Sequence, residues 1–294
     1  MPMHDAYRRR FFGAAVALLA TLAAAGAGAE PALWAVKGRD NTVYLFGSVH
    51  LLPEGGFTIG GALSEAFDDA ERVCLELDPE AENDAQKTSL TLARAIDPEG
   101  RSLFDLLGPD ADRVRESADA AGIDIAPFAA FEPWFAGLTV SLIALQTHGF
   151  DVEHGVEQII QAEAKKDGKT GCGLETLDGQ LGMLDSLSAE LQKEMLLQSL
   201  EEAGDVEAVI GPLLAAWRDG DEAGLEDRLD QDFDDYPELA EALIFERNRN
   251  WAGQVNAMLE GDDDVLVVVG AMHLVGPRGL PALLEKRGFR VKRL

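Results

Sequence analysis

Two histidines in this chain follow the same pattern, an apolar run that ends in Gly-x-x-His. His50 follows the run Val43-Tyr44-Leu45-Phe46, and His273 follows the run Val265-Leu266-Val267-Val268-Val269. Runs this apolar and this rich in β-branched residues predict buried strands. Because chemistry in open α/β sheets collects at the carboxyl ends of the strands, we expect the two histidines to share one site.

A carboxylate belongs to the same predicted site. Glu76 lies inside the apolar strand-like segment Arg72 to Leu77. Burying a carboxylate is costly unless a cation, a metal ion or several hydrogen-bond donors face it. The sequence leaves two interpretations open for Glu76, a ligand or general base in the site and a structural carboxylate paired with Arg247.

Glu175 and Arg247 are further candidates for this site. Glu175 ends the short apolar segment Lys169 to Leu174, and its alternative role is to cap the helix that follows. Arg247 has a side chain that binds carboxylates in a bidentate way, so it would hold a carboxylate of the site or of a substrate. The alternative for Arg247 is a surface ion pair with Glu246 or Glu241.

Imidazole and carboxylate together are the ligand set of zinc, manganese and cobalt sites. The sequence therefore predicts a divalent metal ion (Mn, Co or Zn) bound by His50, Glu76 and His273. A metal ion with an open position lowers the pKa of bound water and produces a nucleophile at neutral pH, with a glutamate as general base. The chain contains no G-x-S-x-G, H-E-x-x-H or Walker motif that would indicate another chemistry.

The order of elements predicts an α/β fold, a central mixed sheet that carries both Gly-x-x-His motifs and has large helical insertions between its strands. Apolar runs and turn residues place strands near both ends and in one short middle segment. The expected strands are 33–36, 42–46, 72–77, 169–174, 265–269 and 289–294; the expected helices are 61–70 and 279–286, with helical insertions at about 83–166 and 177–259.

The chain has 294 residues, is 47% hydrophobic and has a net charge of −28. This composition is ample for a sizeable core, and residues 30–294 are expected to form a single domain. Nucleic acids and anionic membrane surfaces require basic patches, so the charge argues against both as partners.

The first 29 residues have the pattern of a signal peptide. Arg8 to Arg10 form a positive segment, Phe11 to Ala25 are apolar, and Ala27-Gly28-Ala29 fits a cleavage site. We therefore expect export, to the periplasm, with removal after Ala29; the general secretory and twin-arginine routes both remain open. No other stretch is apolar enough to insert stably in a bilayer. After export, Cys74 and Cys172 would be two free thiols or one disulfide between neighbouring strands.

These motifs, taken in order, resemble the TraB/GumN family, which is related to the Tiki metalloproteases and more distantly to the erythromycin-esterase and ChaN-like proteins. The resemblance rests on both Gly-x-x-His motifs and on four shorter segments. These segments are Leu75-Glu76-Leu77-Asp78-Pro79, Gly155-Val156-Glu157, Gly173-Leu174-Glu175-Thr176 and Glu246-Arg247-Asn248.

The resemblance implies one α/β domain and a divalent-metal hydrolase, with peptide cleavage attributed to the Tiki branch. On this basis His50, Glu76 and His273 match catalytic or metal positions, and Glu175 and Arg247 match characteristic ones. The function predicted is a periplasmic metal-dependent hydrolase of peptides or small molecules. Two alternatives remain, a protein that sequesters a peptide or small ligand without cleaving it, and a protein that handles metal or haem fragments. The sequence does not predict an oligomeric state.

Overall fold

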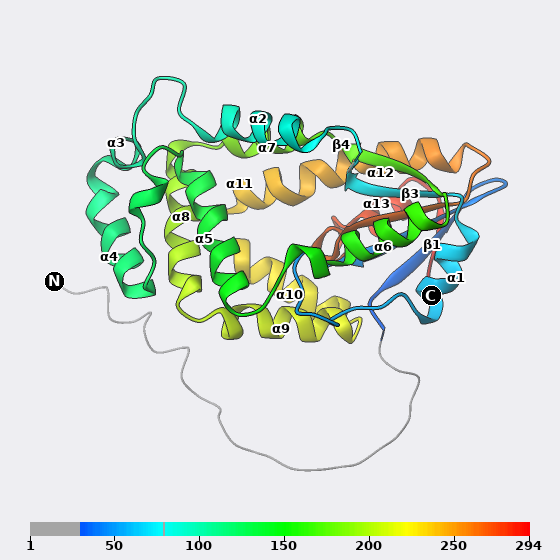
Figure 1. Cartoon of the computed structure of the whole chain (residues 1–294). Coiled ribbons are helices and arrows are strands. Elements are labelled where there is room, and N and C mark those ends of the chain that lie inside the picture. Colours follow the sequence, from blue (N-terminus) through cyan, green and yellow to red (C-terminus); the bar gives the residue numbers. More distant parts are fainter. Residues whose placement is uncertain (1–29, 79) are drawn as a thin grey trace, which may run out of the picture.

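One six-stranded mixed sheet forms the centre of the protein. The computed structural model describes residues 30–78 and 80–294, and the predicted signal peptide lies outside these residues (Figure 1). The strand order across the sheet is β4-β3-β5-β2-β1-β6. The strands are β1 (Leu33–Lys37), β2 (Thr42–Ser48), β3 (Arg72–Leu77), β4 (Thr170–Glu175), β5 (Val265–Gly270) and β6 (Arg290–Arg293).

Four neighbouring strands run in the same direction. β5 pairs in parallel with β2 on one side and with β3 on the other, and β3 pairs in parallel with β4. The carboxyl ends of these four strands therefore lie along one edge of the sheet. β1 forms the expected antiparallel hairpin with β2, and β6 pairs antiparallel with β1. The predicted α/β class with a mixed sheet is confirmed.

Alternate side chains of the central strands enter two separate cores. Phe46, Leu75 and Val268 point to one face, where the sheet is covered by α1 (Gly61–Asp69) and α6 (Val156–Lys166). Leu45 and Val267 point to the other face, which is covered by α12 (Glu246–Leu259) and α13 (Leu280–Lys286). Both faces of the parallel strands are thus buried, which explains why these strands are apolar along their whole length instead of alternating.

Parts of both helical insertions form a layer beyond the carboxyl edge of the sheet, at the left of Figure 1. The last helix of each insertion, α6 and α12, covers a face of the sheet instead. α5 from the first insertion packs against α8 from the second, and together with α3 and α4 they enclose a further apolar core. The helices before β4 are α1 (Gly61–Asp69), α2 (Asp84–Ala95), α3 (Leu103–Leu107), α4 (Ala111–Ala121), α5 (Pro133–Thr147) and α6 (Val156–Lys166). Those after β4 are α7 (Leu177–Asp185), α8 (Ala189–Ala203), α9 (Val206–Arg218), α10 (Glu222–Phe233), α11 (Pro237–Ala240), α12 (Glu246–Leu259) and α13 (Leu280–Lys286).

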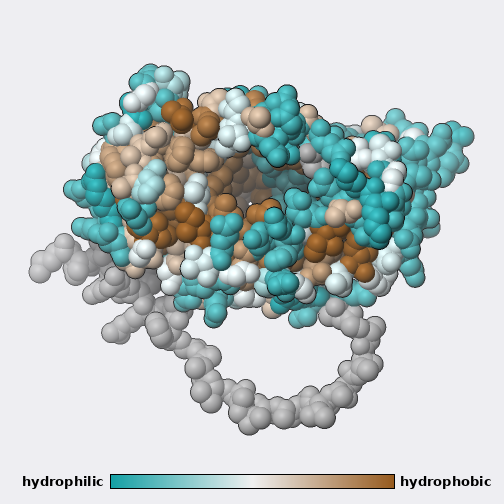
Figure 2. Space-filling model, viewed as in Figure 1, coloured by the Kyte–Doolittle hydropathy of each residue, from teal (hydrophilic) through white to brown (hydrophobic). Residues whose placement is uncertain are grey.

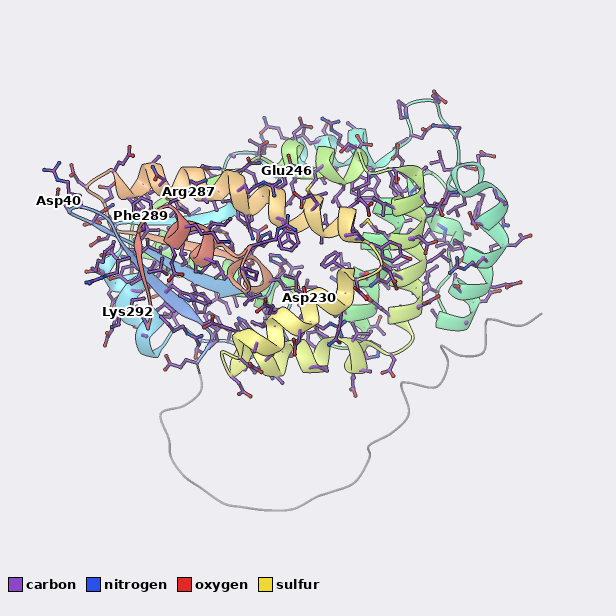
Figure 3. All side chains as sticks on the ribbon, turned by 180° about the vertical axis from the view of Figure 1, so that it is seen from behind. Asp40, Asp230, Glu246, Arg287, Phe289 and Lys292 are labelled. Atoms are coloured by element: carbon purple, nitrogen blue, oxygen red, sulfur yellow. A yellow bond between two sulfur atoms is a disulfide. The ribbon has the colours of Figure 1, made fainter. Side chains whose placement is uncertain are left out.

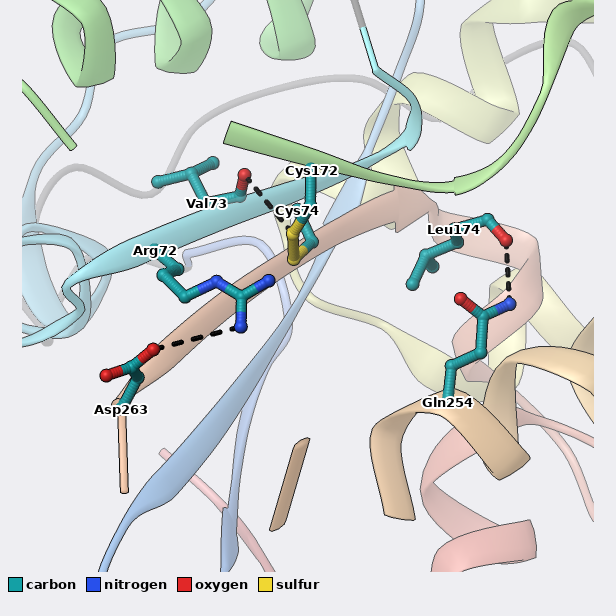
Figure 4. The surroundings of a disulfide bond; sticks show 7 residues. All are labelled: Arg72, Val73, Cys74, Cys172, Leu174, Gln254 and Asp263. Carbon is teal, nitrogen blue, oxygen red and sulfur yellow. Dashed lines mark hydrogen bonds and ion pairs between the residues drawn. A yellow bond between two sulfur atoms is a disulfide. The ribbon is translucent and has the colours of Figure 1, made fainter. Parts of the chain in front are cut away.

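A disulfide joins the two strands at one side of the sheet. Cys74 on β3 and Cys172 on β4 are directly opposite each other in the parallel pairing and are bonded (Figure 4). Near the disulfide, Gln254 of α12 donates a 2.7 Å hydrogen bond to the carbonyl oxygen of Leu174 and so links α12 to β4. Of the two states that the sequence left open for these cysteines, the structure contains the disulfide.

Within residues 30–78 and 80–294, none of the helices combines the length and the apolar character needed to cross a membrane.

Candidate active site

The two Gly-x-x-His motifs meet because their strands are neighbours. β2 and β5 pair in parallel, with Ser48 opposite Gly270 at their carboxyl ends. A Cβ atom placed on Gly270 would lie 3.5 Å from Cδ2 of His273 and 3.8 Å from Nε2 of His50. It would also lie 3.4 Å from Oε1 of Glu76, which comes from the next strand, β3. The three residues predicted as one site therefore surround a single point.

His50 forms an acid–base pair with Glu157. Its Nδ1 atom lies 2.6 Å from Oε1 of Glu157, the second residue of α6, and the hydroxyl of Ser48 donates to the same oxygen. Enclosure by the pocket alone lowers the pKa of His50, but the charge and hydrogen bond of Glu157 outweigh it and raise the pKa to about 9. The side chain keeps 59% of its surface exposed, so water screens part of this interaction. Because Glu157 occupies Nδ1, Nε2 is the nitrogen left for chemistry.

Arg247 uses every one of its N–H groups within the protein. It lies in the first turn of α12. The first residue of that helix, Glu246, is labelled in Figure 3. Nε donates to Glu175, and Nη2 donates to both Glu175 and Glu76. Nη1 donates to the Leu243 carbonyl at 3.0 Å and contacts Nε2 of His273 at 3.1 Å. A guanidinium has five N–H donors, so none of them is left over for a substrate.

Glu76 is held as a carboxylate at the floor of the site. Oε1 accepts a 2.8 Å hydrogen bond from the backbone N–H of Gly270, and Oε2 accepts from Arg247. Burial alone raises the pKa of Glu76, but neighbouring His273, Arg247 and His50 and the Gly270 amide outweigh it and lower the pKa to about 2. Since His273 is uncharged at neutral pH, the charge of Arg247 is the main reason that Glu76 stays ionised there.

His273 is buried and neutral, unlike His50. Its side chain is only 4% exposed, and its ring packs against Trp251 with 4.5 Å between ring centroids. Its Nδ1 atom lies 2.7 Å from Oδ1 of Asn248, a fully buried residue of α12. Burial lowers the pKa of His273 to about 3 despite the nearby Glu76 carboxylate. The two histidines that look alike in sequence therefore differ in charge.

A pocket of about 380 Å³ opens over these groups, with His50, Glu76 and Glu157 at its base. Its walls come from the first turns of α6 and α7 and from the end of β3. They combine apolar side chains, three amides and three charged groups: Leu75, Leu77, Val152, Leu177, Gln158, Gln161, Gln180, Asp78, Glu82 and Lys87. Figure 2 shows that this face of the molecule is hollowed near its centre, where apolar residues gather.

The predicted metal ligands do not form a ligand set as they are arranged here. Imidazole and carboxylate suit a divalent ion, and His50 Nε2 and Glu76 Oε1 both border the space beside Gly270. The lone pair of His273 Nε2, however, faces a hydrogen-bond donor of Arg247. In the part of the chain that the structure describes, no group of three or more His, Cys, Asp or Glu side chains is placed to hold a metal ion.

The structure brings all five predicted site residues together: His50, Glu76, Glu175, Arg247 and His273. It decides the alternatives that the sequence left open for two of them. Glu175 does not cap α7, because the capping side chain is that of Thr176. Arg247 makes no surface pair with Glu241, which contacts Arg249 and Arg278 instead.

Sequence reasoning assigned no role to Glu157 or Asn248. Both stand in segments that carry the family resemblance, and this was the one signal that singled them out. Glu157 lies in the first turn of α6, and Asn248 lies in the first turn of α12. Capping residues also stand near helix starts, so their positions in the sequence do not show whether these residues cap a helix or belong to a site. Their roles depend on the distant histidines that the fold brings to them.

Comparison with known proteins decides the family. The model of the TraB/PrgY/gumN family matches residues 32–293. This chain belongs to the TraB/PrgY/gumN family. The match covers every strand and helix described above, so the two histidine motifs, Glu76 and Arg247 all lie inside the region that defines membership. No curated protein and no solved structure matches the chain.

Proposed function

We propose that this TraB/PrgY/gumN family member is an exported hydrolase that cleaves peptide bonds in the pocket above Glu76. The single observation that carries the proposal is the His50–Glu157 pair, in which a carboxylate occupies Nδ1 and leaves Nε2 beside Glu76 in an open pocket. A carboxylate-supported imidazole of this kind is the usual acid–base device of hydrolases.

His50 and Glu76 have complementary roles in the proposed reaction. The pKa of His50, about 9, leaves Nε2 protonated in most molecules at neutral pH, so the reactive form is the one that has lost this proton, and activity would rise with pH toward 9. In that form a water molecule between the two residues would give its proton to Nε2 of His50 as it attacks the substrate carbonyl. Glu157 would stabilise the imidazolium that forms, and that imidazolium would return the proton to the leaving amine. Glu76, an acceptor at all pH values above about 2, would orient the water through a free lone pair.

Arg247 and Glu175 support this site instead of reacting. Arg247 is fully hydrogen-bonded to protein groups, so its role is to fix the Glu76 carboxylate and balance its charge. Glu175 accepts from Nε and from Nη2 of the same guanidinium, and so holds it in place beside Glu76.

The pocket walls favour a peptide over other small substrates. Gln158 and Gln161 lie one and four residues after Glu157 on α6, and Gln180 lines the pocket from α7, where its Nε2 donates to Glu175. Side-chain amides match the donors and acceptors of a peptide backbone. The apolar side chains between them would contact the side chains of the substrate.

The proposal assigns no step to a metal ion, because the donor set is not arranged for one. A metal-dependent peptidase nevertheless stays a prediction from the sequence, and one experiment compares the two versions. A peptide library would be incubated with the protein after chelation, and with added Mn²⁺, Co²⁺ or Zn²⁺. Cleavage after chelation supports the acid–base mechanism, whereas cleavage only with added metal would replace it by the metal-dependent one.

The matched variants are His50→Gln, which removes the acid–base residue, and His148→Gln, which alters an exposed histidine at the end of α5. We expect cleavage to be lost in the first and kept in the second. Recovery of intact bound peptides without cleavage under any condition would overturn the hydrolase and favour the sequestering protein.

A further inference from the structure

We infer that the two Gly-x-x-His histidines have different roles, and that His273 is a neutral hydrogen-bond acceptor which, fixed by Asn248, positions Arg247. His273 is thus a positioning residue and not a ligand or a base. The inference extends the proposed function, because Arg247 in turn holds the Glu76 carboxylate. It rests on hydrogen-bond geometry that is independent of whether any substrate is cleaved.

The tautomer of His273 follows from its two neighbours. Arg247 has only donors, so the His273 Nε2 atom 3.1 Å from Nη1 must accept and therefore carries no proton. On the other side of the ring, Asn248 donates through Nδ2 to the carbonyl oxygen of Arg278 at 2.9 Å. Its Oδ1 atom is then the one that faces Nδ1 of His273, and it can only accept. The ring is left with one proton, on Nδ1.

This arrangement closes both nitrogens of His273 to other partners. A metal ion at Nε2 would have to displace a guanidinium that also binds Glu76 and Glu175. The ring packs against Trp251 and is 4% exposed, and it cannot turn toward the pocket without breaking the contact with Asn248. Nε2 of His50, in contrast, has no such donor beside it among the described contacts.

As a result, a series of hydrogen bonds connects Asn248 to Glu76 through His273 and Arg247. Asn248 and Arg247 are adjacent on α12. Asn248 fixes the proton of His273 on Nδ1, and Arg247 donates to the lone pair that this leaves on Nε2. Arg247 then fixes Glu76 on β3. A change in the protonation of His273 would therefore reach the reacting carboxylate without any contact between His273 and substrate.

Nuclear magnetic resonance tests the tautomer directly and requires no activity. The full chain would be labelled with ¹⁵N-histidine, and His4, His148 and His154 replaced by Gln so that only the two motif histidines give signals. At neutral pH we expect His273 to show one protonated nitrogen, Nδ1, and one unprotonated nitrogen, Nε2, with no change on addition of Zn²⁺. A proton on Nε2, or a shift of that nitrogen with Zn²⁺, would overturn the inference.

The variant Asn248→Asp tests whether His273 acts as a neutral hydrogen-bond acceptor or as a metal ligand. An aspartate still accepts from Nδ1 but favours a charged imidazolium, whose Nε2–H points at Arg247 and cannot accept from it. We therefore expect kcat to fall by roughly 10- to 100-fold, the range of one lost hydrogen bond to a charged group, with KM little changed. Asn256→Asp, an exposed change on the same helix, is the control.

A metal-ligand role predicts the reverse result, because a carboxylate behind a ligating histidine strengthens metal binding. Unchanged or increased kcat in Asn248→Asp would thus overturn the inference, as would a gain in Zn²⁺ affinity. If no peptide is cleaved by the unaltered protein, the proposed function fails, and the tautomer measurement still decides the role of His273.

Discussion

Nδ1 of His50 lies 2.6 Å from the carboxylate of Glu157, although 107 positions separate the two residues in the chain. This pairing gives His50 a charge that its counterpart His273 lacks. It follows from the place of α6, whose first turn lies beside the carboxyl end of β2; the backbone N–H of Val156 donates to the carbonyl of Val49.

Glu157→Gln removes the charge that raises the pKa of His50. We expect that pKa to fall from about 9 toward the ordinary value of 6.5, because a neutral amide stabilises the imidazolium less. If His50 is the general base, the acidic limb of the pH–rate profile, where Nε2 loses its proton, shifts to lower pH by the same amount. Histidine NMR titration measures the pKa without a substrate. Glu163→Gln on the exposed side of α6 is the control, and an unchanged pKa in Glu157→Gln would contradict the assignment.

The same pair makes stability depend on pH in a defined window. The folded-state pKa of His50, about 9, lies above the unfolded value of 6.5, so protonation stabilises the folded protein. This contribution is complete below pH 6.5 and is lost as the pH rises from 6.5 through 9. Urea unfolding at pH 6, 7.5 and 9 would show a decrease for the unaltered chain that is smaller in His50→Gln. An equal decrease in both would show that the pair is not the source.

Removing the Arg247 side chain leaves one buried carboxylate, Glu76, and one half-buried carboxylate, Glu175, without their cation. We expect Arg247→Met to lower the free energy of unfolding by about 3–5 kcal/mol, the cost of breaking a buried ion pair from one side. Arg249 lies on the same helix as Arg247 and forms an exposed ion pair with Glu241. Arg249→Met should therefore lower the free energy of unfolding by at most about 1 kcal/mol. Denaturant unfolding measures both.

A triple variant checks the reason for that loss. Adding Glu76→Gln and Glu175→Gln to Arg247→Met removes the unpaired charges, and we expect most of the lost stability to return. If the triple variant is as unstable as Arg247→Met alone, packing of the arginine stem and not charge is responsible.

Gly270→Ala separates folding from activity. The backbone of Gly270 has φ −49°, which any residue adopts, and the new Cβ would meet its neighbours no closer than 3.4 Å. We expect stability within about 1 kcal/mol of the unaltered chain. The methyl group would nevertheless occupy the space between His50, Glu76 and His273, where the attacking water is placed. Peptide cleavage should fall sharply, and full activity would place the water elsewhere.

Loss of the disulfide should destabilise the sheet near the site. The bond closes a loop between residues 98 positions apart, for which the expected stabilisation is roughly 2–5 kcal/mol. Cys74→Ala with Cys172→Ala is compared with the unaltered chain by denaturant unfolding, each with and without reductant. Reductant should destabilise only the unaltered chain. A reductant effect of equal size in the double variant would mean that the disulfide is not its cause.

The sequence by itself determined the strands and the convergence of the motif histidines with Glu76. The runs before His50 and His273 are apolar along their length, which only strands buried on both faces require, and chemistry at such strands lies at their carboxyl ends. These patterns depend only on residues that are neighbours in the chain, so they can be recognised without the structure. Glu175, at the end of a predicted strand, and Arg247, a residue type that binds carboxylates, were candidates for the same site on their own, and the family resemblance matched both.

Only the tertiary structure decided the partners and the protonation of these residues. Nothing near His50 or His273 in the chain distinguishes them; Glu157 arrives beside one from α6, and Asn248 and Arg247 arrive beside the other from α12. A pKa depends on charges and burial within a few ångströms in space, and those neighbours are far away in sequence. For this reason two identical motifs yield one charged and exposed histidine and one neutral and buried histidine.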